Sequence, residues 1–410
     1  MPYPRPTLYR LKALAFATLA LSFSTATLAA PNPDDWESVL EDAQGQTVYW
    51  NAWGGDTRTN RYIDWVANEM QRRHNVEVRH VKLDDTGNAV SRVLAEKQAG
   101  NDDEGSVDLI WINGENFAAM RERDLLFGPF AESLPNFALT YPDDNPEVVT
   151  DFTLPTEGYE SPWGKAQITF YYDSAHVQNP PRSIDALLDW AEENPGQFTY
   201  PRIPDFTGST FLKQALIELS EQDDALYQPV SESDFGAVTA PLWDYLDTLH
   251  PQLWRSGRSF PDSGPALRTL MSDGELSLAF SFYPSEAAVA VQEYQLPESV
   301  RSYVFEGGTL GNVHFVAIPY NSPHKAGAMT LANFLLSPEA QAQKQSLEMW
   351  GDRTVLDVNR LDEKDKARFE QGEAHPAELP ADALSQTLPE PHPSWMTALQ
   401  EAWRERYGTQ

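Results

Sequence analysis

The chain has 410 residues, a formal net charge of −31 at pH 7 and no cysteine. This length is sufficient for two or three domains, each with a buried core. The absence of cysteine excludes disulfides, zinc–thiolate sites and thiol nucleophiles. A nucleic-acid partner is not expected, because binding to a phosphate backbone needs clustered lysine and arginine side chains. After the first thirty residues, no run is apolar for long enough to span a membrane.

The first thirty residues have the organisation of a secretory signal peptide. Basic side chains precede an apolar run from residue 13 to about residue 21, and a Ser/Thr/Ala-rich stretch follows. The apolar run is too short for a permanent membrane helix, although an anchor that stays in place is the alternative interpretation. We expect a signal peptide over residues 1–29 with cleavage after Ala29, because Pro31 would hinder a cut after Ala30. The mature protein is therefore expected in a periplasm.

Residues 47–123 alternate between apolar, strand-like runs and segments with helical spacing. The predicted strands are 47–50, 76–83 and 107–112, and the predicted helices that follow them are 58–73, 88–99 and 117–123. Threefold alternation of strand and helix predicts a parallel sheet with helices packed on it.

The remainder of the chain suggests a second α/β unit and a return to the first. An extended segment at 164–172 is expected to link the two units. Further helices are predicted at 183–193, 211–219, 326–336 and 394–407, and further strands at 197–200, 276–282 and 314–318. The expected domains are 30–164 with about 291–350, 165–290, and a helical or irregular segment at 351–410 packed on the lobes, on one of them or bridging both.

Candidate ligand contacts lie in loops after predicted strands, because ligands of open α/β sheets bind beyond the carboxyl ends of the strands. The first loop contains Asn51, Trp53, Gly54 and Gly55, which offer an amide, an aromatic face and exposed backbone N–H groups. The alternative is that the glycines make the turn and Trp53 belongs to the core.

A second loop, between a predicted strand and a helix, contains Asn113 and Glu115. Asn113 is expected to contact a ligand, or alternatively to cap the following helix. A third loop places Ser209 and Thr210 at the predicted start of a helix, where free N–H groups would form an anion site. Ordinary capping by Ser209 explains that pattern equally well.

The remaining candidates are aromatic, acidic or amide side chains near the second unit. Tyr283 and Glu286 follow a predicted strand and would suit a cation or a hydroxylated group. Tyr172 and Gln167 lie on the extended linking segment, and Trp350 is expected to close the rim. Because neighbouring residues of a strand face opposite sides, at most one of Tyr171 and Tyr172 should reach a cleft. We expect no cofactor and no metal site.

Several short motifs together resemble a known family. They are Trp50–Gly55, Ser161–Gly164, Gln167–Asp173, Pro180–Ser183 and Phe334–Gln341. With these motifs the chain resembles the periplasmic solute-binding proteins of ABC importers, and within them the YnjB family, which is related to binders of thiamine, polyamines and ferric iron. In the iron binders two adjacent tyrosines ligate the metal. This chain has Phe282–Tyr283 at the matching place, which argues against iron.

The resemblance implies a type II periplasmic-binding-protein fold, in which two α/β lobes are joined by a hinge and enclose a ligand cleft. Such a protein closes on a small-molecule solute and performs no chemistry. The implied partners are an ABC permease and its ATPase at the inner membrane, and we expect the protein to be a monomer. The cleft residues named above suit a small, polar organic solute, partly cationic or phosphorylated.

The alternative function is an exported hydrolase, glycosidase-like or esterase-like, that uses carboxylates of the cleft. The sequence has neither a Gly-x-Ser-x-Gly motif nor a His-Glu-x-x-His motif. Asp84 and Asp85 form the pair best suited to glycoside chemistry, although a solvated acidic loop explains them more simply. A purely structural envelope protein is a third possibility, to which a clefted α/β fold is poorly suited.

Overall fold

The computed structural model describes residues 1–3, 30–370 and 374–408. Contacts divide the chain into Met1–Ala30 and Pro31–Gln410. The predicted signal peptide falls almost entirely on residues 4–29, outside the described residues. Among the helices that are described, none has the length and apolar character needed to cross a membrane.

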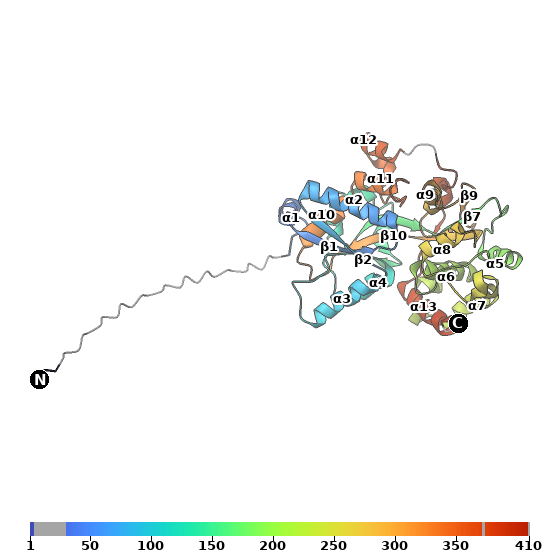
Figure 1. Cartoon of the computed structure of the whole chain (residues 1–410), viewed down its shortest axis with the longest axis horizontal. Coiled ribbons are helices and arrows are strands. Elements are labelled where there is room, and N and C mark those ends of the chain that lie inside the picture. Colours follow the sequence, from blue (N-terminus) through green and yellow to red (C-terminus); the bar gives the residue numbers. More distant parts are fainter. Residues whose placement is uncertain (4–29, 371–373, 409–410) are drawn as a thin grey trace. The chain divides into compact units, whose positions relative to one another are not determined.

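The first sheet contains the three strands predicted to be parallel. Strand β1 (Thr47–Trp53) pairs in parallel with β2 (Glu77–Leu83) and with β3 (Leu109–Ile112). The order is β11-β10-β3-β1-β2, and β6 pairs with β10. Helices α2 and α10 lie on one side of this sheet and α3 and α4 on the other (Figure 1). The helices of this part are α1 (Trp36–Ala43), α2 (Thr57–His74), α3 (Gly87–Gln98), α4 (Gly114–Glu122), α10 (Lys325–Leu335), α11 (Pro338–Gln345) and α12 (Glu363–Lys366).

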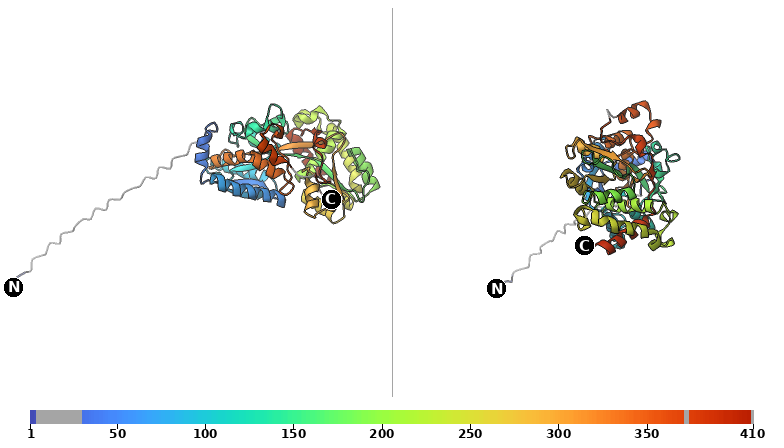
Figure 2. Two further views of the ribbon diagram at one scale, coloured as in Figure 1. Left: turned by 90° about the horizontal axis from the view of Figure 1, so that it is seen from above. Right: turned by 90° about the vertical axis from the view of Figure 1, so that its right-hand side faces the viewer.

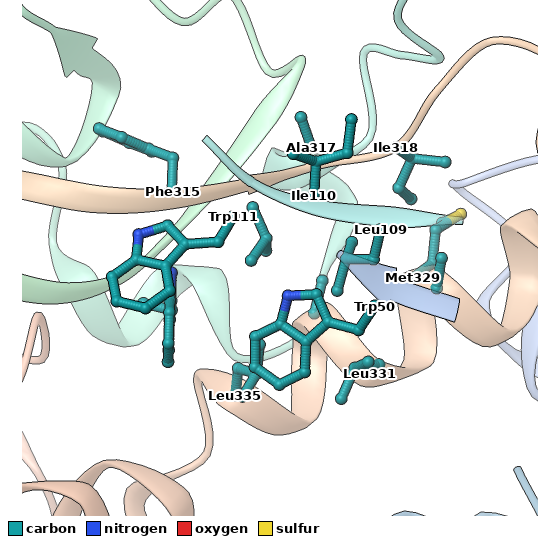
Figure 3. Close-up of a cluster of buried hydrophobic side chains, with 14 of the residues drawn as sticks. Trp50, Leu109, Ile110, Trp111, Phe315, Ala317, Ile318, Met329, Leu331 and Leu335 are labelled. Atoms are coloured by element: carbon teal, nitrogen blue, oxygen red, sulfur yellow. The ribbon is translucent and has the colours of Figure 1, made fainter. Parts of the chain in front are cut away.

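The strands of this sheet are apolar because helices cover both faces. All four residues of β3 are buried, and Leu109 lies beside Trp50 of β1. Figure 3 shows Trp50 and Trp111 packed with Leu331 and Leu335 of α10 in one continuous core. We call the part of the chain that forms this core lobe 1.

A second, separate core surrounds a smaller antiparallel sheet. Its central strand β7 (Thr169–Asp173) lies between β8 (Leu278–Ser281) and β9 (Val300–Tyr303). The part of the chain that forms this core is lobe 2. Its helices are α5 (Ile184–Glu193), α6 (Phe206–Leu219), α7 (Phe235–Leu249), α8 (Gly264–Ser272), α9 (Glu286–Gln292) and α13 (Pro393–Tyr407). The remaining short strands are β4 (Thr150–Asp151), β5 (Leu154–Pro155) and β11 (Thr387–Leu388).

An antiparallel strand pair passes from one lobe to the other. It consists of β6 (Glu160–Gln167) and β10 (Thr309–Ala317). Trp163 and Val313 belong to the core of lobe 1, whereas Ala166 and Leu310, a few residues along the same strands, belong to the core of lobe 2. The pairing register shifts between His314 and Phe315. Two backbones that cross together in this way have the geometry of a hinge.

The carboxyl-terminal segment is anchored on lobe 2. Helix α13 lies against the other helices of that lobe in both Figure 1 and Figure 2. Trp395 and Trp403 are fully or almost fully buried there, and the Trp403 indole N–H donates to the Tyr200 hydroxyl at 2.8 Å. Just before α13, Glu390 accepts a hydrogen bond from Lys213 of α6 at 2.5 Å, with both side chains buried. The domain boundaries drawn from the sequence stay a prediction.

Two local expectations were wrong. No strand forms at 197–200, because its carbonyls bond to two different segments: that of Gln197 accepts from Ser277 and Leu278, and that of Phe198 accepts from Trp254. The apolar pattern there reflects burial of Phe198 and Tyr200. Helix α6 begins at Phe206 and not at residue 211, because the Asp205 carboxylate accepts hydrogen bonds from the backbone N–H groups of Thr207 and Gly208.

We predict that Glu390→Ala lowers the free energy of unfolding by about 3–5 kcal/mol, because it leaves the buried Lys213 ammonium without its partner. Urea unfolding followed by fluorescence measures this loss. The control is Glu363→Ala, which removes a carboxylate that is 92% exposed and should cost less than about 1 kcal/mol. Equal losses in the two variants would contradict the prediction.

Candidate functional site

A cavity of about 390 Å³ lies between the two lobes. This volume is in the range of sites that hold small organic molecules. Both lobes line the cavity, and the carboxyl-terminal segment adds Met396 and Gln400. The lining residues used below are Trp53, Asp56, Asp84, Asp85, Trp111, Asn113, Glu115, Arg202, Asp205, Phe206, Asp262, Arg268, Phe282, Tyr283, Glu286, Asn312 and His314.

The lobe 1 wall is built by the ends of parallel strands. Trp53 ends β1, Asp84 and Asp85 follow β2, and Asn113 follows β3. Parallel neighbouring strands end at the same edge of a sheet, so these side chains meet at one place. The rule that selected these loops from the sequence therefore describes this wall.

The lobe 2 wall comes from three helices and the loop before the last of them. Phe206 begins α6, Arg268 lies on α8 and Glu286 begins α9. Phe282 and Tyr283 lie between β8 and α9, and the Phe282 ring meets the Phe206 ring edge-on at 5.4 Å between centroids. This wall thus combines aromatic faces with charged groups.

Three buried charges and one partly buried charge, Arg268, join the lobes beside the cavity; we call Asp56, Arg58, Arg268 and Glu286 the ion ring. The Arg58 Nη2 of lobe 1 donates to Glu286 Oε2 of lobe 2 at 2.7 Å. In the opposite sense, Arg268 Nη1 of lobe 2 donates to Asp56 Oδ2 of lobe 1 at 3.2 Å. Arg58 also bonds Asp56, and Arg268 also bonds Glu286.

The ion ring keeps the Asp56 carboxylate ionised. Burial alone would raise the pKa of Asp56, but the hydrogen bonds and charge of Arg58, with the charge of Arg268, lower it to about 2. Each arginine of the ring has a carboxylate partner in its own lobe and another across the seam.

An aromatic cluster supports the cavity from behind. The Trp350 ring lies 5.7 Å from Tyr283 and parallel to His314, with 6.4 Å between those centroids. His314 Nε2 is 2.9 Å from Asp352 Oδ1, and the other oxygen of Asp352 accepts from Lys344 Nζ at 2.6 Å. This buried chain fixes the orientation of the His314 ring, which lines the cavity.

Two carboxyl groups of the lining have raised pKa values. Burial raises the pKa of Glu115 to about 7, and the nearby charges of Glu390 and Asp85 act in the same direction against Lys213. Burial also raises the pKa of Asp205 to about 6, despite its hydrogen bonds to the start of α6. Desolvated carboxyl groups at a cavity are characteristic of functional sites.

The structure brings together five of the thirteen predicted contact residues. Trp53, Asn113, Glu115, Tyr283 and Glu286 line the cavity. Within the same first loop, Asn51 is buried and donates to the Tyr49 carbonyl. Gly54 and Gly55 serve close packing, because an added Cβ would lie 2.6 Å from Lys82 Cβ and 2.5 Å from the Trp53 ring, respectively.

The other predicted residues lie outside the cavity lining. Gln167 is buried at the lobe 2 end of the β6–β10 pair, where it donates to Thr309 and to the Gln386 carbonyl. Tyr172 stacks edge-on with Tyr303, and Trp350 lies in the aromatic cluster rather than at the rim. Contact of these residues with a ligand stays a prediction.

Ser209 and Thr210 lie inside α6 rather than at its start. The Ser209 hydroxyl accepts from Gln400 of α13, and the Thr210 hydroxyl donates to the Phe206 carbonyl. The expected anion site on free N–H groups at these residues is therefore wrong, because Asp205 already caps the helix.

Sequence reasoning missed several residues of the cavity. Asp56 and Phe206 lie in or beside loops that the strand-end rule considered but were not chosen from them, and Arg268 follows no predicted strand. Asp56 and Asp205 each stand one residue before a helix and are recognisable as N-caps. His314 lies within a strand and had no local signal. The described residues contain no group of three or more His, Asp or Glu that could hold a metal ion.

Comparison with known proteins gives consistent matches. A family model described as bacterial extracellular solute-binding protein matches residues 65–368. Protein YnjB of Escherichia coli (strain K12) is 46% identical over 387 residues, which cover 94% of this chain and 96% of YnjB.

Solved structures of low sequence identity share the fold. The periplasmic binding protein AfuA from Actinobacillus pleuropneumoniae, with fructose-6-phosphate bound, has a TM-score of 0.63 at 14% identity, over 89% of this chain and 99% of AfuA. The spermidine/putrescine ABC transporter substrate-binding protein PotD from Streptococcus pneumoniae has a TM-score of 0.60 at 14% identity, over 89% and 99%. The two-lobed type II fold expected from the sequence is thereby confirmed.

We predict that Glu115→Gln stabilises the protein at pH 8 and not at pH 4.5. The folded pKa of Glu115 is raised to about 7 from 4.5, so the folded state loses stability as pH rises between these values. The variant has no such loss, and its advantage should grow to at most about 3 kcal/mol above pH 7. Urea midpoints across this range measure the effect, and the exposed Glu104→Gln should show none.

We also predict that Glu286→Gln separates the lobes in the absence of ligand, because Arg58 and Arg268 then share a single carboxylate. Small-angle X-ray scattering should show a larger radius of gyration. The control, Glu293→Gln, removes a more exposed ion pair with Arg61 at the same α2–α9 contact and should change the radius less. An unchanged radius in Glu286→Gln would show that the ion ring does not hold the lobes together.

Proposed function

Because the chain belongs to the bacterial extracellular solute-binding protein family, we propose that it captures a small, polar organic solute and delivers it to the permease of an ABC importer. The permease and its ATPase partner at the inner membrane are the proposed receivers. The predicted signal peptide would carry the chain to the periplasm, where we propose that it acts as a monomer.

The observation that carries this proposal is the cavity between lobes that share a strand pair. Residues of both lobes line it, and β6 and β10 cross together from one lobe to the other. Separation of the lobes about this pair would open the cavity, and closure would surround a solute on both sides.

The family and its structural neighbours are binding proteins of transporters and not enzymes. The carboxylate pair that the hydrolase hypothesis needs also has the wrong arrangement. Asp84 and Asp85 are neighbours in one loop of lobe 1, whereas glycoside hydrolysis needs two carboxyl groups on opposite sides of the scissile bond. The hydrolase hypothesis therefore has no support.

The identity of the solute does not follow from the fold. AfuA holds a sugar phosphate, and PotD is named for polyamines, although both share this architecture. The chemistry of the cavity lining must therefore select the solute.

A thermal-shift screen over sugars, phosphates, amino acids, polyamines and thiamine derivatives tests the proposed function, because a bound ligand stabilises the folded state. One ligand should bind per chain, without turnover, and it should lower the radius of gyration of Glu286→Gln, the variant whose lobes are expected to separate without ligand. Hydrolysis of esters or glycosides without a melting shift would overturn the proposal.

We predict that Trp53→Ala and Tyr283→Ala each weaken binding of the solute found in this screen at least tenfold, because each removes an aromatic face of the cavity. Titration calorimetry measures the affinity, and circular dichroism should show an intact fold. The control is Tyr294→Ala, whose side chain is 95% exposed and lies outside the cavity lining. Unchanged affinity in both cavity variants would place the site elsewhere.

A further inference from the structure

We propose that the cavity selects an organic cation whose positively charged nitrogen carries N–H donors and is attached to an apolar body. This inference rests on the proposed function and names the class of solute. Three features of the lining support it: the balance of charge, the direction of its hydrogen-bonding groups and its aromatic walls.

The first feature is an excess of negative charge that no lining residue balances. Arg268 is held within the ion ring by Glu286 and Asp56, and Arg202 pairs with Asp262 at 2.9 Å. In the described part of the lining, these two arginines are thus matched by carboxylates.

Four further carboxyl groups of the lining have no such partner among the described residues. They are Asp84, Asp85, Glu115 and Asp205. The cation whose charge lowers the pKa of Glu115 is Lys213, which is itself bonded to Glu390 at 2.5 Å. A cationic solute would supply the missing charge, whereas an anion would add to the repulsion.

The second feature is that buried polar groups turn their donors towards the protein and leave acceptors for a ligand. His314 is 4% exposed, and its Nε2 is directed at Asp352. A Cβ on Gly164 would meet His314 Cδ2 at 2.5 Å, so the Nε2–Cδ2 edge of the ring faces inward. The opposite edge carries Nδ1, which has no hydrogen-bond partner in the described structure.

A neutral His314 ring that donates from Nε2 to Asp352 accepts a hydrogen bond at Nδ1. The Asp352 carboxylate accepts the Nε2 proton, and its single negative charge is already balanced by the Lys344 ammonium. With the proton on Nε2, Nδ1 offers a lone pair and no donor.

Two asparagines of the lining follow the same pattern. Asn312 Nδ2 donates to Glu390 Oε1 at 2.9 Å, and Asn113 Nδ2 donates to the Val313 carbonyl at 2.6 Å. The Asn312 Oδ1 atom is buried without a partner among the described groups. A buried acceptor without a donor is costly, and an ammonium group supplies N–H donors of the required kind.

The third feature is an aromatic surface for the rest of the solute. Phe206 lines the cavity and remains 37% exposed, although it is a large apolar side chain. Trp53, Trp111 and Tyr283 present further aromatic rings. Such rings pack against an apolar body and attract a neighbouring cation through their faces.

The test compares molecules that share a skeleton and differ in charge. One series is 2-phenylethylamine, 2-phenylethanol and phenylacetate; the other is 1,4-diaminobutane, 1,4-butanediol and succinate. At pH 8, titration calorimetry should show that at least one amine binds at least tenfold more tightly than its alcohol and its carboxylate.

Variants then locate the effect in the cavity. Glu115→Gln and Asp84→Asn should each weaken binding of that amine at least tenfold and leave binding of the alcohol unchanged. The matched controls Glu104→Gln and Asp103→Asn remove the same charges at exposed positions outside the lining and should change neither.

The inference is overturned if an alcohol or carboxylate binds as tightly as its amine, or if neither amine binds at about 10 mM. Loss of amine binding in the controls as well would assign the effect to net charge and not to the cavity. If an uncharged or anionic probe binds and the lobes close on it, the proposed selection of a cation is wrong, while the proposed capture of a solute still holds. If the protein converts any probe into a product, the proposed function of binding without chemistry is wrong.

Discussion

The arrangement of this protein depends on a small set of buried charges where the lobes meet. Each arginine of the ion ring has one carboxylate in its own lobe and one in the other. A buried charge without a partner costs free energy. When the lobes separate, Arg58 loses Glu286 and Arg268 loses Asp56, so separation removes one carboxylate partner from each arginine. The ring therefore favours the closed arrangement of the lobes and fixes the register in which their two cavity walls face each other.

In the cavity beside the ion ring, in contrast, carboxyl groups lack a cationic partner. Glu115 and Asp205 are desolvated without a matched cation among the described lining residues, and burial raises the pKa of both. Two buried carboxylates elsewhere in the chain are paired with lysines, Glu390 with Lys213 and Asp352 with Lys344. Unpaired carboxyl groups at one place cost stability, and binding of a complementary solute would recover it. The ion ring thus favours closure of the lobes, and the unbalanced charge of the cavity favours binding of a solute that supplies the missing charge.

The aromatic residues near the cavity fall into two groups: buried rings that support it from behind and partly exposed rings that line it. Trp163 and Trp350 are buried in the cluster behind the cavity, where they hold His314 and Tyr283. Trp53 and Phe206 retain exposed surface in the cavity itself. A sequence shows that all of these are large apolar side chains but not which layer each belongs to, and for that reason Trp350 was expected at the rim.

The sequence by itself determined the features that depend on neighbouring residues. Alternation of apolar runs and helical spacing predicted the parallel strands of lobe 1, and the strand-end rule selected Trp53, Asn113 and Glu115. The tertiary structure decided everything that depends on the second lobe, including the pairing of Arg58 with Glu286, which are 228 positions apart. It also decided that Gln167 serves the hinge and that the donors of Asn312 and His314 face inward. Local patterns report the periodicity of one element, whereas charge pairing and hydrogen-bond direction are properties of groups that meet after folding.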